Sequence, residues 1–507
     1  MTNTTAAAVA RLATRGNIYP LHRPKAWRDC RYVQAAVSCR DLSRPPSYVV
    51  ALMLVATCPA MAVASPRSDP TVGVTVFTGA ATAHPAGISI NPATIGLGNG
   101  TTAYLGATAT LDQVGANTPA NNGDQGGDVS VISASPGLDV SINSHVGENL
   151  AIGFRAASGP AETFFAPRDN SMRFASLGGR QRDYQFTLAG AYRIGQRTYI
   201  GVSGALGYTD FRWKFSRDIA LDDASLMCGA TPCGIGNPLA AQDYDLKLDS
   251  KILESSVFSL GVIVKITPTS FIGAAYHPPP GFGIVSSLAG ELRLKQPSLS
   301  GGEVIKGSAE LSTSLPASID AEFRSAINPQ LEAHIGGRWQ DLSRLAAFDI
   351  RPYGAAFAST TVPQWLQRPR GFDDAVALWA GIEEIDRGAP LRFGGRLGFE
   401  TSAIAPTRTT VTTIAGPTLS AQLGGQWRVA PGWSLAAHYG FTYFLPRTVT
   451  AESSAYQPAD AWACTAADYD YTLAACERTR QGYTQFAAEG TYTRLQHALR
   501  VGLQYDY

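Results

Sequence analysis

The sequence predicts an all-β protein, a transmembrane antiparallel β-barrel of about 14 strands with an N-terminal hatch inside the lumen. Three observations predict this fold. Apolar and polar residues alternate with a period of two along many segments, tight turns alternate with long polar connections, and glycine is abundant at 51 residues. Weak alternation of this kind, repeated many times along a chain, is typical of barrels that present apolar side chains to lipid and polar ones to the lumen.

Composition excludes several other classes of protein. The 507 residues carry a net charge of +1, and only 16% of them are charged, whereas soluble globular proteins usually have about a quarter. No segment approaches the ~20 apolar residues of a membrane-spanning helix. The chain has no basic stripe of the kind that binds nucleic acid, and its 9% aromatic residues argue against disorder.

Residues 1–64 are expected to form a leader that includes a signal peptide. A short apolar run at 48–56 follows basic residues, and the small-residue pattern at 62–64 places the cleavage site before Ser65. A buried core helix is the alternative, but nine apolar residues followed by Pro59 make a poor long helix. The signal accounts for export of the rest of the chain.

The part of this leader upstream of Arg40 is too long for an ordinary signal, so we expect the true start codon to lie further along the chain. Cys58 suggests a lipoprotein as a second possibility. Thr57 before it is a poor match to the small residue that lipidation usually requires.

Four cysteines remain after the leader, and they fall as two local pairs in polar, turn-rich stretches. An even number in an exported chain favours two disulfides that staple loops. We expect the pairs Cys228–Cys233 and Cys464–Cys476. Zinc binding is the alternative, although no histidine lies near either pair.

The C-terminal segment shows the alternation most clearly. Leu499, Val501 and Leu503 share one face, and Arg500 and Gly502 the other, because successive side chains of a strand point to opposite sides. The chain ends on an aromatic residue, as outer-membrane barrels usually do. Equivalent apolar faces recur upstream at Phe258, Leu260, Val262, Val264 and Ile266, at Leu391, Phe393, Leu397 and Phe399, and at Trp433, Leu435, Tyr439, Phe441 and Tyr443.

Connection lengths support a barrel with two different ends. Tight turns are expected at 195–197, 267–269, 327–329, 386–388 and 430–432, and long loops near 217–243, 351–370 and 450–482. Outer-membrane barrels have short periplasmic turns and long extracellular loops, so both cysteine pairs should lie outside the cell. The strands are expected to begin near 102, 129, 147, 182, 198, 243, 270, 305, 330, 371, 389, 412, 432 and 483.

Residues 65–100 do not alternate and are rich in small residues and glycine. We interpret them as a hatch that plugs the lumen, ahead of a barrel formed by residues 101–507. A loose periplasmic tail is the alternative, and composition does not separate the two.

The sequence resembles the outer-membrane long-chain fatty acid and aromatic hydrocarbon transporter family (FadL/TodX type). The hatch contains a small-residue run that leads into Asn91-Pro92-Ala93, similar to that family's N-terminal motif. The similarity covers most of residues 70–507. Two departures are His84-Pro85, where an acidic residue is common, and Tyr507 in place of a terminal Phe. Further similar stretches are Leu315-Pro316-Ala317-Ser318, Asn328-Pro329, Gly337-Arg338-Trp339 and Leu391-Arg392-Phe393-Gly394-Gly395.

This resemblance implies a monomeric barrel of 14 strands, closed by its hatch, that takes up hydrophobic molecules such as fatty acids. In the family, ligand lands in an apolar groove of the extracellular loops, moves to an internal pocket, and leaves after the hatch rearranges, often by lateral exit through the wall. The resemblance also implies the bacterial outer membrane, with outer-membrane lipid around the wall and the barrel-assembly machinery acting on the C-terminal strand.

Two groups of residues are candidates for ligand binding. Phe164, Phe165, Leu226 and Met227 are candidates for the apolar groove, and local loop packing is their alternative role. Arg338, Arg392 and Arg396 are expected to face the lumen, where a guanidinium pairs well with a carboxylate. These arginines have an alternative role in an internal ion-pair ladder with Glu332, Glu384 and Glu400.

We therefore expect a channel for hydrophobic compounds with no catalytic residues, metal or cofactor, and with no nucleic-acid partner. One alternative is a general porin or a barrel that serves only structure or adhesion. Another is an outer-membrane lipolytic enzyme with a Ser–His dyad inside the barrel.

Overall fold

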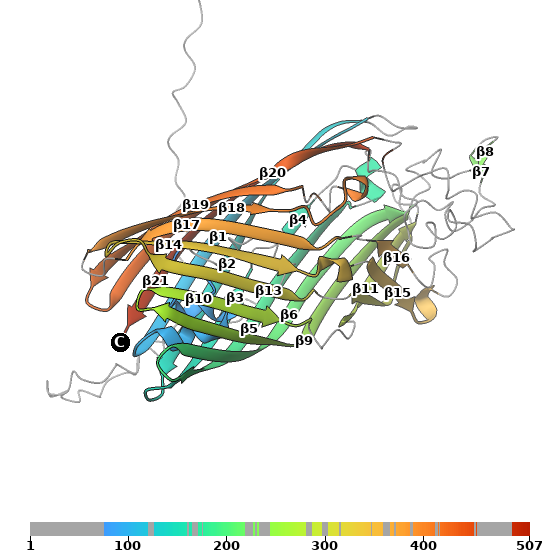
Figure 1. Cartoon of the computed structure of the whole chain (residues 1–507). Helices are drawn as coiled ribbons and strands as arrows, with labels where there is room; N and C mark the ends of the chain where they lie inside the picture. Colours follow the sequence, from blue (N-terminus) through green and yellow to red (C-terminus); the bar gives the residue numbers. More distant parts are fainter. Residues whose placement is uncertain are drawn as a thin grey trace, which may run out of the picture. The chain divides into compact units, whose positions relative to one another are not determined.

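The computed structural model describes the following residues: 76–119, 126–159, 162–164, 171–174, 176–217, 227–228, 231–232, 244–279, 286–296, 303–313, 316–345, 347–357, 366–369, 372–385, 389–410, 414, 416–450, 453 and 489–507. Their secondary structure is almost entirely antiparallel strand (Figure 1). Within these residues no helix is long and apolar enough to cross a bilayer.

The wall of the barrel is one sheet of 19 strands. The strands are β1 (Thr101–Thr118), β2 (Gly127–His145), β3 (Leu150–Ser158), β4 (Glu162–Phe164), β5 (Gly178–Ile194), β6 (Thr198–Arg217), β9 (Tyr244–Thr267), β10 (Ser270–His277), β11 (Ser286–Gln296), β12 (Glu303–Thr313), β13 (Ser318–Ala326), β14 (Leu331–Gln340), β15 (Ala347–Tyr353), β16 (Leu366–Pro369), β17 (Ala375–Glu384), β18 (Leu391–Glu400), β19 (Thr418–Ala430), β20 (Trp433–Val449) and β21 (Gly490–Asp506). A separate ribbon pairs β7 (Met227–Cys228) with β8 (Thr231–Pro232).

Five positions of this wall are each built from two consecutive strands, so the described strands form a barrel of 14 positions, as predicted. Both β3 and β4 pair with β5, and both β10 and β11 pair with β9. In the same way β13 continues β12, β15 continues β14, and β17 occupies the position of β16. Pairing of β1 with β21, from Thr102↔Asp506 to Asn117↔Thr491, closes the sheet.

The predicted alternation is confirmed along the strands. Leu397 of β18 and Leu423 of β19 are both 68% exposed on the outer face, whereas Arg396 and Gln422 beside them are buried toward the lumen. Closure gives the sheet no free edge, so the backbone N–H and C=O groups of the wall can form hydrogen bonds between strands where lipid offers no partner.

Four of the five predicted tight turns join consecutive strands at one end of the barrel, at 195–197, 267–269, 327–329 and 430–432. Gly195 and Gly432 have φ values of 63° and 75°, which a residue without a Cβ adopts without strain. The fifth turn, 386–388, lies outside the described residues. The other end of the barrel carries the long connections.

Two details of the predicted strand map are wrong. The stretch 351–370 is not a single loop, since it contains the end of β15, the short helix η7 (Ala355–Phe357) and β16. The strands expected from 147, 270, 305 and 330 are each interrupted, and the one from 305 consists of β12 and β13 with a break around Pro316. Proline lacks the backbone N–H that a ladder requires, which explains a break there.

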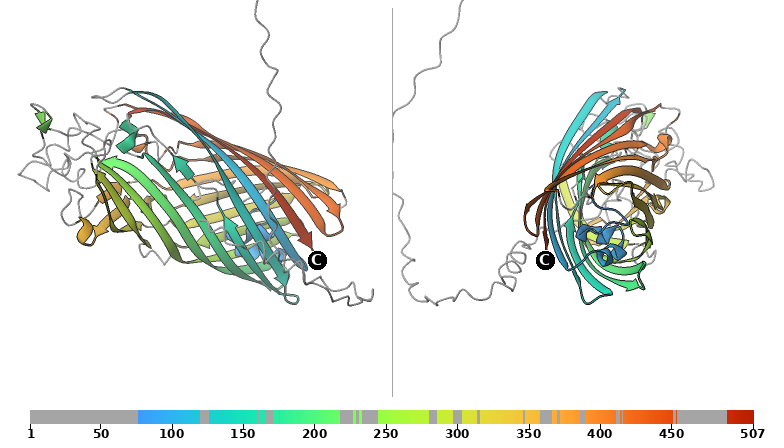
Figure 2. Two further views of the ribbon diagram at one scale, coloured as in Figure 1. Left: turned by 180° about the vertical axis from the view of Figure 1, so that it is seen from behind. Right: turned by 60° about the vertical axis from the view of Figure 1, so that its left-hand side comes forward.

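An N-terminal segment, defined here as residues 76–100, lies inside the barrel near the end with the short turns (Figure 2). It contains two 3-10 helices, η1 (Pro85–Ser89) and η2 (Pro92–Leu97), each preceded by a capping side chain and begun by proline. Proline at the first helical position supplies a fixed φ where its missing N–H costs nothing. Other short helices among the described residues are η3 (Ser171–Phe174), η6 (Leu342–Arg344) and η8 (Pro406–Arg408).

Candidate functional site

Asn91 anchors the N-terminal segment to the wall. Its side chain accepts a hydrogen bond from Ala93 N–H at 3.0 Å and so caps η2. The amide nitrogen donates to the carbonyl oxygen of Ala80 at 2.6 Å and to that of Val262, on β9, at 3.1 Å. One buried amide therefore holds two parts of the segment together and ties both to the barrel.

Three glycines of the wall allow the segment to approach this closely. A Cβ on Gly201 would overlap the backbone of Pro92 and Ala93, and one on Gly261 would overlap the Asn91 side chain. A Cβ on Gly273 would overlap the Ala80 carbonyl. Backbone cannot move aside at Gly201 and Gly273, and at Gly261 the Asn91 side chain is fixed by its hydrogen bonds, so a Cβ would disturb docking at each position.

The two short helices also make an apolar contact with the wall. Ile88 of η1 and Ile95 of η2 pack against Ala151 of β3 and Ala191 of β5, and all four side chains are buried. Small alanines at these wall positions leave room for the isoleucines, so the segment is held by packing as well as by polar bonds.

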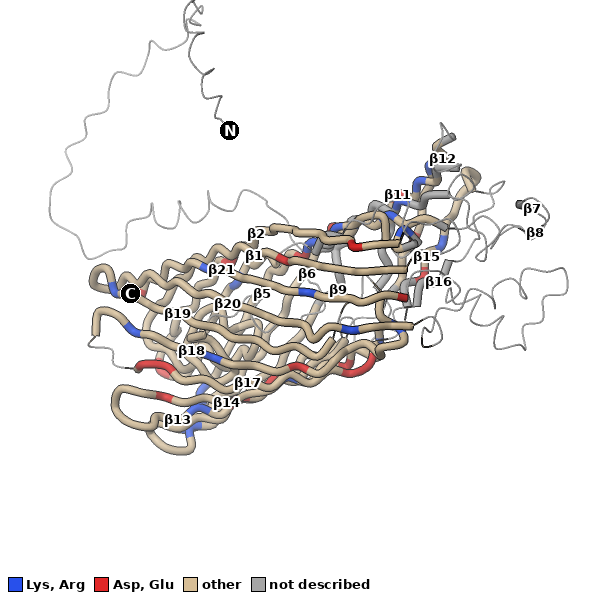
Figure 3. The backbone as a smooth tube through the Cα atoms, turned by 90° about the horizontal axis from the view of Figure 1, so that it is seen from above, with Lys and Arg blue, Asp and Glu red and all other residues tan. Residues whose placement is uncertain are grey.

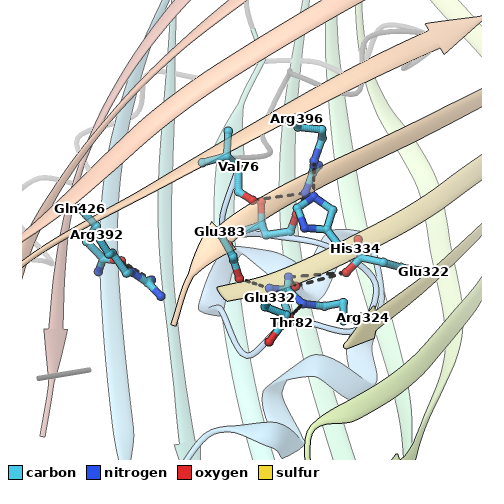
Figure 4. A network of polar contacts seen from close by, with 11 residues as sticks. Val76, Thr82, Glu322, Arg324, Glu332, His334, Glu383, Arg392, Arg396 and Gln426 are labelled. Atoms are coloured by element: carbon cyan, nitrogen blue, oxygen red, sulfur yellow. Dashed lines mark hydrogen bonds and ion pairs between the residues drawn. The ribbon is translucent and has the colours of Figure 1, made fainter. Parts of the chain in front are cut away.

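Arg396 of β18 binds the first turn of the segment (Figure 4). Its Nη2 donates to the carbonyl oxygen of Thr78 at 2.7 Å and lies 3.4 Å from that of Val76. Its Nε donates to Nε2 of His334 on β14 at 3.2 Å. Arg396 is buried, so its charge is compensated there by carbonyl and imidazole dipoles.

Arg324 of β13 is the centre of a second contact with the segment (Figure 4). It forms ion pairs with Glu332 and Glu383 and donates to the hydroxyl of Thr82. Glu322 lies 3.6 Å away and also contacts Thr82. A buried cluster of this kind is strongly destabilised when a single member is removed, because the remaining charges lose their compensation.

The segment also contacts aromatic and cationic side chains of the wall. The Phe77 ring lies 4.4 Å from the guanidinium of Arg392 and 5.4 Å from the His438 ring. The His84 ring packs edge-on against Tyr104 at 4.8 Å, and its Nδ1 accepts from Ala86 N–H.

Burial lowers the pKa of His84 to about 3, and the nearby charges of Arg392, Arg500 and Arg155 act in the same direction. The neutral ring suits the cap, because a protonated Nδ1 cannot accept a hydrogen bond. Arg155 pairs with Asp139 at 2.7 Å, and Arg500 donates to the Thr108 hydroxyl at 2.8 Å.

Ser259, His277 and Asp320 form a chain of contacts that resembles a hydrolytic triad. The Ser259 hydroxyl lies 2.8 Å from Nδ1 of His277, and Nε2 lies 3.2 Å from the Asp320 carboxylate. The carbonyl oxygen of Ile90 is closer to Nε2, at 3.0 Å, and Arg338 pairs with Asp320 at 2.7 Å. This arrangement holds the imidazole as a bridge between wall and segment.

The lumen changes character toward the end with the long connections. Phe211, Trp213 and Phe215 of β6 point inward and form a buried apolar cluster with residues of β11, β12, β15 and η7, namely Leu292, Leu294, Ala309, Leu311, Ile350 and Phe357. A second apolar cluster contains Val114, Ala116, Met172, Ile414, Val449 and Tyr492. The described interior is therefore apolar toward the end with the long connections, whereas both polar and apolar side chains line it around the N-terminal segment.

A family model described as "Outer membrane protein transport protein (OMPP1/FadL/TodX)" matches residues 68–486. The chain belongs to this family. Its members are transport proteins and not enzymes, so the family does not support the lipolytic alternative.

Solved structures of the family share the fold of this chain. A FadL homologue from Pseudomonas aeruginosa is 12% identical, with a TM-score of 0.66, covering 88% of this chain and 98% of its own. The toluene transporter TbuX from Ralstonia pickettii is 16% identical, with a TM-score of 0.55 and coverage of 88% and 99%. The toluene transporter TodX from Pseudomonas putida is 12% identical, with a TM-score of 0.57 and coverage of 86% and 100%. Among curated proteins none matches significantly.

Arg338, Arg392 and Arg396 were predicted to face the lumen of the barrel, and they do. Each of them has a partner there. Arg338 pairs with Asp320, Arg392 donates to the Gln426 side chain at 2.7 Å, and Arg396 binds the N-terminal segment. The expected ladder is different in detail: Glu332 pairs with Arg324, and Glu384 accepts from the Phe393 N–H. Glu400 is buried on β18.

The other predicted site residues divide into two groups. Asn91, Pro92 and Ala93 lie at the start of η2, against the wall. Phe164 lies in β4 and Met227 and Cys228 lie in β7, while Phe165, Leu226, Cys233, Cys464 and Cys476 lie outside the described residues.

Sequence reasoning missed Arg324, Gly261 and Gly273. Arg324 alternates with apolar Phe323 on β13, which is the pattern that identified Arg338 and Arg392, so its lumen position was detectable. The glycines carry no such signal, because their role depends on which segment packs against them.

Proposed function

We propose that this chain is a monomeric barrel of the bacterial outer membrane that takes up hydrophobic small molecules such as long-chain fatty acids. The observation that supports this most strongly is the apolar cluster around Trp213 beneath the long connections, at the opposite end of the lumen from the N-terminal segment. A water-filled porin has no use for such a cluster. Related structures are named as channels for toluene and monoaromatic hydrocarbons, so aromatic ligands belong to the same proposal.

The apolar cluster would take ligand from the loops. Each Å² of apolar surface removed from water contributes roughly 25 cal/mol, so a long acyl chain or an aromatic ring gains several kcal/mol on entering it. Phe357, on η7, packs over Gly307 of β12 at the edge of this cluster. Phe164, Phe165, Leu226 and Met227 remain proposed groove residues outside it.

Residues 65–100 would act as the hatch. In its docked position the segment is held by Asn91, Arg396 and Arg324, and passage past it requires these contacts to loosen. Ligand would then diffuse onward without an energy source. Arg392 and Arg338 are proposed to bind the carboxylate of the ligand on this path. Arg392 would exchange its Gln426 partner for the ligand, and Arg338 would exchange Asp320, so each guanidinium would keep a hydrogen-bond acceptor.

Two further partners are proposed for the outer surface of the barrel, namely outer-membrane lipid and the barrel-assembly machinery. Outer-membrane lipid would cover the exposed apolar side chains, such as Leu397 and Leu423. The barrel-assembly machinery would act on β21, which ends beside Tyr507.

Uptake into proteoliposomes tests the function. Oleate and toluene should enter faster than a sugar of similar size, and mass spectrometry of protein extracted in mild detergent should find a bound apolar molecule that oleate displaces. Free entry of sugars with no bound lipid would favour the porin alternative and contradict the proposal.

Two matched variants locate the binding site. Phe357→Ala should weaken oleate binding, since it removes an aromatic side chain from the cluster without altering a wall strand. Phe186→Ala removes a ring of the same size from the lipid-facing surface, where Phe186 is 51% exposed, and should leave binding unchanged. Equal effects of the two substitutions would place the ligand elsewhere.

Deletion of residues 65–100 tests the hatch. Single-channel conductance in planar bilayers should rise, because the lumen would lose the segment that fills it. Unchanged conductance would show that these residues do not close the channel.

A further inference from the structure

Arg500 of β21 is a buried cation without an acidic partner. Its side chain faces the lumen and is almost inaccessible to solvent. The Nε donates to the Thr108 hydroxyl of β1 at 2.8 Å. Among the residues that the structure describes, Nη1 has no hydrogen-bond partner and no carboxylate pairs with this guanidinium. A buried charge is costly unless it is compensated, so the missing counter-charge calls for an explanation.

The strands on either side of Arg500 place no acid directly beside it. Thr108 of β1 lies opposite on one side and His438 of β20 on the other. β20 contains no acidic residue. The acidic residue of β21, Asp506, is near the other end of the strand and accepts a hydrogen bond from the Thr102 hydroxyl at 2.8 Å. Strand register therefore gives Arg500 a hydroxyl and an imidazole as neighbours, and no counter-ion.

Other acidic side chains of this part of the wall already have arginine partners. Asp112 of β1 pairs with Arg494 at 2.7 Å, and Asp139 of β2 pairs with Arg155 at 2.7 Å. Figure 3 marks the basic and acidic positions along these strands. Residues 76–100, which cover them from the lumen side, contain no Asp or Glu. The charge of Arg500 is therefore left over after these pairs have formed.

Tyr104 of β1 brings a second unpartnered donor to the same place. Its ring lies over Gly106 and Gly502, where added Cβ atoms would come within 2.7 and 2.5 Å of the phenol oxygen. These glycines oppose each other one inward position before the Thr108–Arg500 pair, so the hydroxyl points toward that pair. The Tyr104 hydroxyl is buried and has no hydrogen-bond partner in the described part of the chain.

The N-terminal segment closes this space from the lumen side. The His84 ring packs edge-on against Tyr104 at 4.8 Å, and Phe77 packs against His438, the neighbour of Arg500, at 5.4 Å. With the segment docked, bulk water cannot compensate the guanidinium. A single trapped water could accept from the two donors, but it carries no charge and leaves the positive charge uncompensated.

We propose that Arg500 and Tyr104 bind a monovalent anion when the N-terminal segment is docked. Both groups are donors, which a halide or a carboxylate can accept, and one spare positive charge matches one negative charge. The occupant is chloride from the medium or the carboxylate of a transported acid, and only the second source rests on the proposed function. Because the site is enclosed only in the docked state, the anion stabilises docking by mass action.

The test measures broadening of the chloride NMR signal by the full chain in neutral detergent. Arg500→Gln removes the charge, and Tyr104→Phe removes only the hydroxyl. The matched control is Arg494→Gln, which removes a lumen-facing arginine of the same strand that is paired with Asp112. Hydrogen exchange at residues 76–92 is followed in the same proteins while chloride replaces gluconate at constant ionic strength.

Chloride should bind Arg500→Gln at least roughly tenfold more weakly than wild type, because a charge-assisted hydrogen bond is lost. Tyr104→Phe should bind it about fivefold more weakly, because a neutral bond is worth less. Arg494→Gln should bind it as wild type does. Chloride should slow exchange of the segment in wild type and in the control, and should have no effect in Arg500→Gln. Tyr104→Phe carries the comparison if Arg500→Gln does not fold.

Carboxyl-labelled oleate in chloride-free buffer distinguishes the two sources of the anion, with methyl oleate as its uncharged counterpart. Loss of oleate binding in Arg500→Gln, with methyl oleate binding unchanged and no chloride effect in any protein, would assign the site to the ligand's carboxylate. If Arg500→Gln and Arg494→Gln bound chloride equally and also bound oleate equally, the proposed anion site would be overturned. Oleate binding retained in both variants would then leave the proposed uptake function intact.

Discussion

Arg396 and Thr78 are 318 positions apart in the sequence, yet the guanidinium of one donates a 2.7 Å hydrogen bond to the carbonyl oxygen of the other. The bond joins the barrel wall to the first turn of the N-terminal segment, in a place from which water is largely excluded. Charge-assisted bonds are among the stronger contacts in proteins. This one therefore helps to hold the N-terminal segment against the wall.

Replacing this arginine should loosen the segment without unfolding the barrel. In Arg396→Gln the shorter amide cannot reach both the carbonyl and His334, and a bond to a charged group is worth about 1.5–3 kcal/mol. Hydrogen exchange at residues 76–84 should accelerate roughly tenfold or more. Arg494→Gln is the control, since Arg494 pairs with Asp112 on β1. Equal exchange in the two variants would show that Arg396 does not hold the segment.

Adding one methyl group to the wall should displace the segment. Gly273→Ala would place a Cβ against the backbone of Ala80, whereas Gly190→Ala on β5 has open space around its Cβ. Overpacking typically costs about 1–3 kcal/mol, so channels of the Gly273→Ala variant should open more often in planar bilayers. Identical recordings from both variants would refute the close packing of segment and wall.

Acid should release the segment through His84. The pKa of this buried imidazole is lowered from 6.5 to about 3 when the segment is docked, so the undocked state binds more protons between those values. Docking is then fully stable above pH 6.5 and weakens as the pH falls toward 3, by up to about 1.4 kcal/mol per pH unit.

The variant His84→Asn separates this effect from general acid destabilisation. Asparagine retains an acceptor for the Ala86 N–H but does not titrate. Protease cleavage of the segment should therefore rise between pH 7 and pH 4.5 in wild type and rise less in the variant. The same rise in both proteins would assign the pH dependence to other groups.

The cysteine pairs give a prediction that rests on the sequence alone. If Cys228–Cys233 and Cys464–Cys476 are disulfides, the intact mass of the exported protein should be lower by about four hydrogen atoms before reduction than after it. Equal masses would remove both bonds and return the zinc alternative to consideration.

The wall could be predicted from the sequence because its information is local. Alternation along β18 or β21 follows from the geometry of a single strand, and a lipid-facing surface requires it over the whole length. Turn residues such as Gly195 and Gly432 signal hairpins for the same reason. These local patterns determined the strand count, the two unlike ends of the barrel and the inward direction of Arg338, Arg392 and Arg396.

The contacts around the N-terminal segment depended on the tertiary structure. Gly273 differs from Gly190 only in what lies across from it, and Arg396 binds a carbonyl instead of a carboxylate because closure of the barrel brings Thr78 there. The sequence by itself determined which faces are apolar, and pairing and closure decided which polar side chains meet.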